Sequence, residues 1–280
     1  MISRRLFPLL LPALLAALAC SPGGRSAAPH PPEAPSVLEP VPETPVVADR
    51  GRRGVFERLP GVDPPVRDFL VEPDGGESVP GILLVHDWWG LDEGTRSLAR
   101  DLAAKGFLVV APDLYEQVVA TSRTSATELL AGIDGKRASS LLTAALRRLA
   151  SHPRFNGRAF LLGVEQGGDF ALPFAAARAG TKEDPPLRGL VLDSTNLSLH
   201  MDELPRVGCP VLWLVGAGSA AFGADAERQW KEAARRGGVE LTVVLVPGAG
   251  TGLLDPRSLG YREPAYGKAL ERIVAWIGGR

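Results

Sequence analysis

Long apolar runs, each followed by a segment with helical spacing, are the feature that most constrains the fold of this chain. The runs GILLVH (81–86), FLVVAPD (107–113) and AFLLG (159–163) contain almost no polar residues, as is typical of strands buried on both faces. The segments between them carry leucines one helical turn apart, such as Leu98 and Leu102. This alternation predicts an α/β fold with a doubly wound, mostly parallel sheet and helices on both faces.

The same pattern continues on both sides of these runs. We expect further strands at 66–73, 187–193, 210–216 and 241–248. We expect helices at 91–105, 136–150, 166–179, 226–236 and 263–277. The last helix places its large apolar side chains on one stripe, at Tyr266, Leu270, Ile273 and Ile277. Ligands of such a fold are expected at the carboxyl ends of the parallel strands.

Residues 1–19 are typical of a bacterial lipoprotein signal peptide. Arg4 and Arg5 precede an apolar stretch that is too short and too interrupted by proline to span a membrane. The stretch ends in Ala-Leu-Ala-Cys, which resembles a lipobox and predicts lipidation of Cys20. Ser21 after the cysteine favours the periplasmic face of the outer membrane. The alternative is an ordinary secretory signal and a secreted or periplasmic protein.

The composition of the remaining chain indicates its domain organisation and the kinds of partner that the protein can bind. Residues 20–50 are rich in Pro and Ala and predict a tether, and 51–280 form the folded domain. A formal net charge of −1 gives no basic field for nucleic acid. The expected partners are the membrane through Cys20 and either a small-molecule ligand or an envelope protein. With 2 cysteines and 4 histidines, we expect no metal site, and we expect no cofactor.

The segment GVEQGG (163–168) has the glycine pattern of a nucleophile elbow. In an elbow, a sharp turn between a strand and a helix exposes a catalytic side chain, and the surrounding glycines allow the close packing of that turn. The position that Ser or Cys would occupy holds Glu165. The backbone pattern of a hydrolase is therefore present without the usual attacking group.

Three segments carry a resemblance to a known family: LLVHDWWGLDEGTRSLARDLAAKGFLVVAPDLY (83–115), FLLGVEQGGDFAL (160–172) and VPGAGTGLLDPRS (246–258). Together they resemble the dienelactone hydrolase family, a branch of the α/β-hydrolases. The resemblance covers 55–277 and implies the α/β-hydrolase fold. It also implies a catalytic triad of Cys or Ser, His and Asp.

All three positions of the implied triad are substituted. Glu165 stands at the nucleophile position, and Thr251 stands where the family's Gly-x-Gly-His-Gly loop carries its histidine. After the strand that ends near Gly216, the region of Ser219 holds no acid before Asp225. Loss of one triad member costs about four to six powers of ten in rate. We therefore expect a pseudoenzyme that retains the family fold and does not perform its hydrolysis.

The alternative is an active hydrolase of esters or lactones that uses an unrecognised set of residues. A carboxylate at position 165 can in principle attack carbon, but Thr251 cannot act as the base that hydrolyses the resulting ester. Asp193, at the end of a predicted strand, and His200, in the following loop, are further candidates for an acid and a base. Neither has a serine or cysteine at the elbow to activate.

The resemblance places a pocket above the elbow. Its expected residues are His86, Asp87, Trp88, Trp89, Glu165, Gln166 and Thr251. If the pocket is filled, the two tryptophans are the side chains expected to fill it. Asp87 and Glu165 are expected either to share a partly desolvated pocket, with a proton, arginine or cation between them, or to lie apart with Glu165 facing solvent or the following helix N-terminus.

Overall fold

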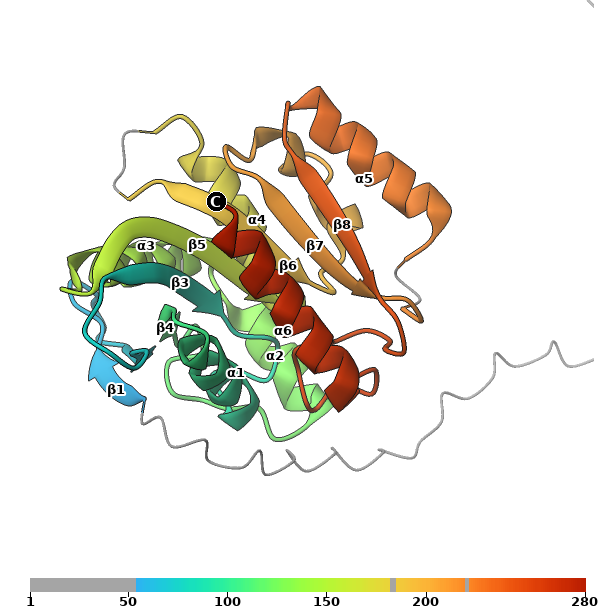
Figure 1. The fold of residues 1–280 in the computed structure, drawn as a ribbon. Coiled ribbons are helices and arrows are strands. Elements are labelled where there is room, and N and C mark those ends of the chain that lie inside the picture. The colour runs from blue at the N-terminus through green and yellow to red at the C-terminus, as the bar shows by residue number, and fades with distance from the viewer. Residues whose placement is uncertain (1–53, 182–184, 220–221) are drawn as a thin grey trace, which may run out of the picture. The chain divides into compact units, whose positions relative to one another are not determined.

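A sheet of eight strands runs through the protein (Figure 1). The computed structural model describes residues 54–181, 185–219 and 222–280. The predicted signal peptide, Cys20 and the tether lie outside these described residues. The strands are β1 (Val55–Arg58), β2 (Arg67–Val71), β3 (Val79–Val85), β4 (Leu108–Pro112), β5 (Phe155–Val164), β6 (Leu187–Asp193), β7 (Val211–Gly216) and β8 (Leu241–Val246).

The strand order is β1-β2-β4-β3-β5-β6-β7-β8. Strands β3 to β8 pair in parallel, and β1 and β2 add an antiparallel edge. The predicted doubly wound, mostly parallel sheet is confirmed. Strand β5 lies between β3 and β6, so the segment that leads into GVEQGG occupies the interior of the sheet. In the described part of the chain, no helix is long and apolar enough to cross a membrane.

Helices pack on both faces of the sheet (Figure 1). They are α1 (Glu93–Ala104), α2 (Arg123–Gly132), α3 (Gly135–Ser151), α4 (Gly168–Arg178), α5 (Ala224–Arg236) and α6 (Glu263–Gly278). Short 3₁₀ turns are η1 (Glu165–Gly167), η2 (Leu197–His200) and η3 (Leu204–Arg206). Side chains of α1 and α6 join the core on one face, and those of α3, α4 and α5 join the core on the other. Strand β1 and helix α2 were not predicted.

The central strands are buried on both sides because their side chains alternate between two cores. In β3, Leu83 and Val85 pack with the core of α3 to α5, whereas Ile82 and Leu84 pack with that of α1 and α6. All four side chains are fully buried. Burial of each contributes roughly 1.5–3 kcal/mol. This packing fixes the carboxyl ends of β3, β5 and β6, from which the elbow and its surrounding loops extend.

Candidate functional site

The backbone of a nucleophile elbow is intact at Glu165. Strand β5 ends at Val164, η1 follows at once, and α4 begins at Gly168. Glu165 has a φ of 45°, in the left-handed region that residues with a Cβ seldom adopt. Such a conformation costs on the order of 1 kcal/mol and persists only where the surrounding structure imposes it. The turn that presents a nucleophile in hydrolases is therefore kept here with a carboxylate at its apex.

The glycines of GVEQGG are required by close packing. A Cβ at Gly163 would lie 2.7 Å from the Cα of Gly168. A Cβ at Gly167 would collide with the main-chain carbonyl groups of Val85 and His86 at the end of β3. The helix after the elbow thus packs directly against the neighbouring strand, which explains why these positions hold glycine.

The other two positions predicted to correspond to the triad also meet in space. Ser219 follows β7 and Thr251 follows β8, and their side-chain oxygens lie 3.0 Å apart. Asp225, the next acid in the chain, lies in the first turn of α5 and pairs with Arg228 at 3.1 Å on the surface. A pair of hydroxyl groups therefore occupies the two positions at which the sequence resemblance predicted an acid and a base, and neither hydroxyl is a general base near neutral pH.

A cavity of about 400 Å³ opens beside Glu165. Its lining residues are Trp88, Trp89, Arg123, Glu165, Gly218, Thr251, Asp255, Arg257, Ser258, Leu259 and Gly260. Of the residues predicted for the pocket, both tryptophans, Glu165 and Thr251 belong to this lining. The tryptophans form part of its wall and leave the space open. His86, Asp87 and Gln166 lie outside the lining.

His86 has a structural environment. Its Nε2 accepts the backbone N–H of Leu114 at 3.1 Å, so the ring hydrogen is on Nδ1 and is donated to the carbonyl of Asp87 at 2.7 Å. The side chain is 2% exposed, and burial lowers its pKa. A neutral imidazole whose two nitrogens are both engaged joins the loop after β3 to the end of β4. It has no free nitrogen for proton transfer.

Glu165 and Asp87 are both buried, and their negative charges interact. Burial raises the pKa of each carboxyl group well above its ordinary value. The nearby carboxylate of Asp255 adds to both shifts, and Glu165 adds further to the shift of Asp87. Because Glu165 is only 8% exposed, the alternative in which it faces solvent is wrong. The two carboxyl groups occupy one desolvated region, where ionising both of them at once costs free energy.

Asp255 and Arg257 belong to the site but were not predicted as site residues. Burial raises the pKa of Asp255 to about 7, and its Oδ1 accepts the backbone N–H of Arg257 at 2.8 Å. The guanidinium of Arg257 donates to Asp92 at 3.1 Å and lies 3.8 Å from the centroid of the Trp89 ring. Both residues were present in the segment LLDPRS. Only the folded loop reveals that they line the cavity.

Asp193 and His200 do not form an acid–base pair with each other. Asp193 accepts the backbone N–H groups of Leu253 and Leu254, at 3.3 and 3.0 Å, and burial raises its pKa to about 6. His200 instead contacts Asp169 of α4, at 2.9 Å. Asp193 therefore holds the loop after β8 against the end of β6, and His200 lies outside the cavity lining.

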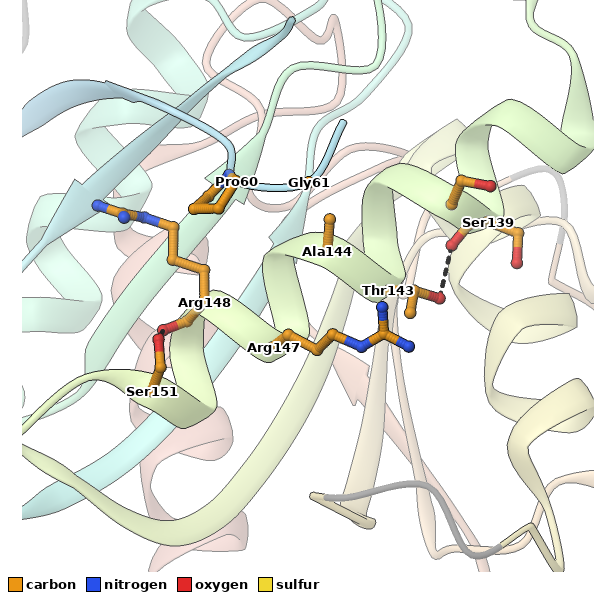
Figure 2. Close-up of a pocket in the computed structure, with 9 residues that line it drawn as sticks. Pro60, Gly61, Ser139, Thr143, Ala144, Arg147, Arg148 and Ser151 are labelled. Atoms are coloured by element: carbon orange, nitrogen blue, oxygen red, sulfur yellow. Dashed lines mark hydrogen bonds between the residues drawn. The ribbon is translucent and has the colours of Figure 1, made fainter. Parts of the chain in front are cut away.

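A second hollow, of about 600 Å³, lies along α3 (Figure 2). Its polar side chains do not point together at a common position where a ligand could bind. The hydroxyl of Thr143 donates to the carbonyl of Ser139 at 2.8 Å, and Ser151 donates to that of Arg148 at 2.9 Å. These hydroxyls satisfy their own helix. Arg148 is paired at 2.6 Å with Asp68, which is fully buried. These polar groups of the hollow thus serve the fold, and the cavity beside Glu165 is the candidate site.

The donor set of the site does not favour a metal ion. Within the described residues, no group of three or more His, Cys, Asp and Glu side chains is arranged to hold one. What the cavity offers is two carboxyl groups, two guanidinium groups, hydroxyls and indole surfaces. Such a lining can bind a small polar molecule and shift protons, but it presents no serine or cysteine at the elbow.

The sheet, the elbow and the loops that meet above it define an α/β-hydrolase fold. The model of the dienelactone hydrolase family matches residues 66–279. The chain belongs to the dienelactone hydrolase family, as the sequence resemblance predicted.

Known proteins resemble this chain over most of its length. A Salmonella typhimurium protein named "Putative carboxymethylenebutenolidase" is 25% identical over 208 residues, which are 71% of this chain and 77% of that protein. A protein of the same name from Methylorubrum extorquens is 24% identical over 79% of each chain.

Solved structures share the fold. A dienelactone hydrolase-like promiscuous phosphotriesterase from metagenomic libraries has a TM-score of 0.68 at 20% identity, over 81% of this chain and 97% of its own. The dienelactone hydrolase of Anabaena variabilis has a TM-score of 0.59 at 18% identity, over 81% of this chain and 98% of its own.

Proposed function

We propose that this protein is a non-hydrolytic member of the dienelactone hydrolase family that binds a small molecule in the cavity beside Glu165. The observation that carries the proposal is the combination of an intact elbow backbone with a buried carboxyl group at its apex. The φ of 45° at Glu165 preserves the presentation of the side chain, while the chemistry of acyl transfer is missing.

The substitutions at the other two positions support the same function. The hydroxyl pair of Ser219 and Thr251 can hydrogen-bond a ligand, but it cannot relay protons as a His–Asp pair does. A cavity of about 400 Å³ is within the size range of small-molecule sites. Without a nucleophile and a base, the protein does not hydrolyse an ester or a lactone. The cavity that remains can still hold a ligand.

A hydrolysis assay tests the proposal. The full-length protein is incubated with p-nitrophenyl acetate and a panel of small lactones, alongside Glu165→Gln. We expect both proteins to hydrolyse these substrates at the rate of the buffer control. Turnover by the native protein that Glu165→Gln abolishes would overturn the non-hydrolytic assignment.

One observation favours the alternative, an active hydrolase of esters or lactones. Glu165 and Asp255 line the same cavity and both have raised pKa values, a pattern found in enzymes that use two carboxyl groups as acid and base. In that case, activity would require both residues and would follow a bell-shaped pH profile. Loss of activity in both Glu165→Gln and Asp255→Asn would support this alternative.

We further propose that lipidation of Cys20 anchors the protein to the bacterial cell envelope, on the periplasmic face of the outer membrane. The support is the Ala-Leu-Ala-Cys sequence after an apolar stretch, together with the Pro-rich segment that follows. Cys20→Ala is the test variant. We expect it to lose the mass of the acyl chains and to move from the membrane fraction to the soluble fraction. Unchanged mass and fractionation would contradict the anchor.

A further inference from the structure

The two edges of the sheet differ in how they are protected against pairing with another strand. Strand β1, at one edge, has four residues, and its Glu57 pairs with Arg148 of α3. Strand β8, at the other edge, has six residues, LTVVLV, with no charge and no proline (Figure 1). Short strands and charged side chains keep the edges of natural sheets from pairing with other chains. Strand β8 has neither protection.

The outer main-chain groups of β8 have no partner within the part of the chain that the structure describes. The carbonyls of Glu240 and Val246 accept backbone N–H groups from β7 and the residue after it, so the even-numbered residues bond toward β7. Alternate residues of a paired strand direct their N–H and C=O groups to opposite edges. The N–H and C=O groups of Leu241, Val243 and Leu245 therefore point outward, away from the sheet.

The side chains of β8 are apolar on both faces and are only partly covered. Leu241 and Val243 are half-buried against the core of α3 to α5, and Val244 is half-buried against the core of α1 and α6. Leu245 is 43% exposed. Apolar surface that remains in contact with water gains free energy when another surface covers it. The open edge of β8 therefore offers both unpaired main-chain groups and uncovered apolar side chains.

The two ends of β8 carry exposed charges of opposite sign. A groove of about 460 Å³ lies between α6 and the carboxyl end of β8, and its charged residues are Lys268, Glu271 and Arg272. Neither of these two cations has an ion-pair partner among the described residues. At the amino end, Glu240 pairs with Arg280 at 2.5 Å, and the carboxylate is the exposed member, at 60% against 22%. The groove is therefore net positive, and the opposite end presents a carboxylate.

A second copy of the same strand fits this edge when it runs antiparallel and the pair is centred on Val243. In that register, Val243 faces Val243 of the second copy, and the two residues exchange both of their outward hydrogen bonds. Leu241 faces Leu245 of the second copy in the same way. Glu240 of one copy then lies beside Val246 of the other, at the end of the strand where the positive groove is. A two-fold axis makes each of these contacts twice.

We propose that the protein forms a dimer in which the β8 strands of two copies pair antiparallel around Val243 and join the two sheets into one. Lys268 and Arg272 of each copy face Glu240 of the other. The carboxylate of Glu240 thereby gains two cations that have no other partner, and the apolar side chains of β8 are covered. This surface is separate from the lining of the cavity beside Glu165, so the inference does not depend on the proposed function.

Sedimentation equilibrium of the full-length protein, in a non-ionic detergent of matched density, tests the proposal. We expect the mass of two chains at about 10 µM. Val243→Pro removes an outward N–H and leaves the bonds to β7, so it should remain folded and weaken the dimer at least about tenfold. Leu245→Lys places a charge on the open edge and should do the same. Leu199→Lys changes another exposed apolar residue, which is 66% exposed, and should leave the dimer unchanged.

Exchange of charges between copies tests the register. Lys268→Glu with Arg272→Glu, and separately Glu240→Lys, should each weaken the dimer by about tenfold, because each groove then meets an end of like charge. An equimolar mixture of the two variants should restore dimers, since every groove again meets an end of opposite charge. A monomeric native protein, a mass above two chains, or a dimer unaffected by both Val243→Pro and Leu245→Lys would overturn the proposal. A mixture that associates no better than its components would contradict the antiparallel register.

Discussion

The side-chain oxygens of Ser219 and Thr251 lie 3.0 Å apart, although the two residues belong to loops that follow different strands. This separation is that of a hydrogen bond, the interaction that joins acid and base in a catalytic triad. The two loops therefore hold these side chains at the separation that an acid and a base of a triad would need. Side-chain exchange alone should restore much of a triad.

Restoration of the triad is the first prediction. The triple variant Glu165→Cys, Thr251→His, Ser219→Asp should hydrolyse p-nitrophenyl acetate at least about a thousandfold faster than the native protein. The physical reason is that the elbow still holds position 165 at a φ of 45°, as a nucleophile requires. Steady-state release of p-nitrophenol is the measurement.

The matched control keeps the base but not the nucleophile. Thr251→His with Ser219→Asp, at an unchanged Glu165, should remain at the native rate because the attacking sulfur is absent. If the triple variant is folded and no faster than this control, the conclusion that the loops retain catalytic geometry is wrong.

A comparison of Glu165→Gly with Glu165→Ala measures the strain at the elbow. Glycine adopts a positive φ without the steric cost that a Cβ imposes. We expect the glycine variant to be more stable than the alanine variant by about 1 kcal/mol, the reverse of their usual order in helices. Urea denaturation provides the free energy of unfolding. The usual order, with alanine more stable, would show that position 165 is relaxed.

Asp193→Ala should destabilise the loop after β8. The substitution leaves the buried backbone N–H groups of Leu253 and Leu254 without their acceptor, at a cost of about 2–4 kcal/mol. Asp193→Asn retains one acceptor oxygen and should cost less. Chemical denaturation gives the loss of stability, and hydrogen exchange at the two amides localises it. Equal stability of native protein and Asp193→Ala would contradict this role.

Asp255 makes the stability of the protein depend on pH. Its folded-state pKa is raised from 3.8 to about 7, so the folded state binds more protons than the unfolded state between these values. The free energy of unfolding should therefore fall as the pH rises from about 4 to about 7.

Asparagine at position 255 cannot ionise. Asp255→Asn should therefore reduce the decrease in the free energy of unfolding between about pH 4 and pH 7 by on the order of 3 kcal/mol. Part of the slope should remain, because Asp193 also has a raised pKa, of about 6. Thermal or urea unfolding across this pH range is the measurement. A native protein whose stability rises over the same range would contradict the assignment of a protonated Asp255.

The sequence predicted the buried part of the fold and missed its periphery. Strand β3 was recognisable because both of its faces are buried and its residues are continuously apolar. Strand β1 has no such pattern, since all of its residues are exposed. Helix α2 buries only Ala126, so its sequence carries almost no apolar stripe. Elements without a buried face cannot be found from a hydrophobic pattern.

The candidate site was predictable at the positions that the family resemblance marks. Glu165 and Thr251 line the cavity, and Ser219 contacts Thr251. Asp255 and Arg257 were not foreseen because their orientation depends on the tertiary path of the loop after β8. That path is fixed by hydrogen bonds to Asp193, sixty residues earlier in the chain.

The interior position of β5 has a consequence for how such proteins diverge. Pairing with β3 holds the chain up to residue 163, and pairing with β6 holds it up to residue 164. The side chain at 165 is thus carried by the sheet and contributes little to holding it. A substitution at this position can therefore exchange one reactive group for another and leave the sheet beneath it unchanged.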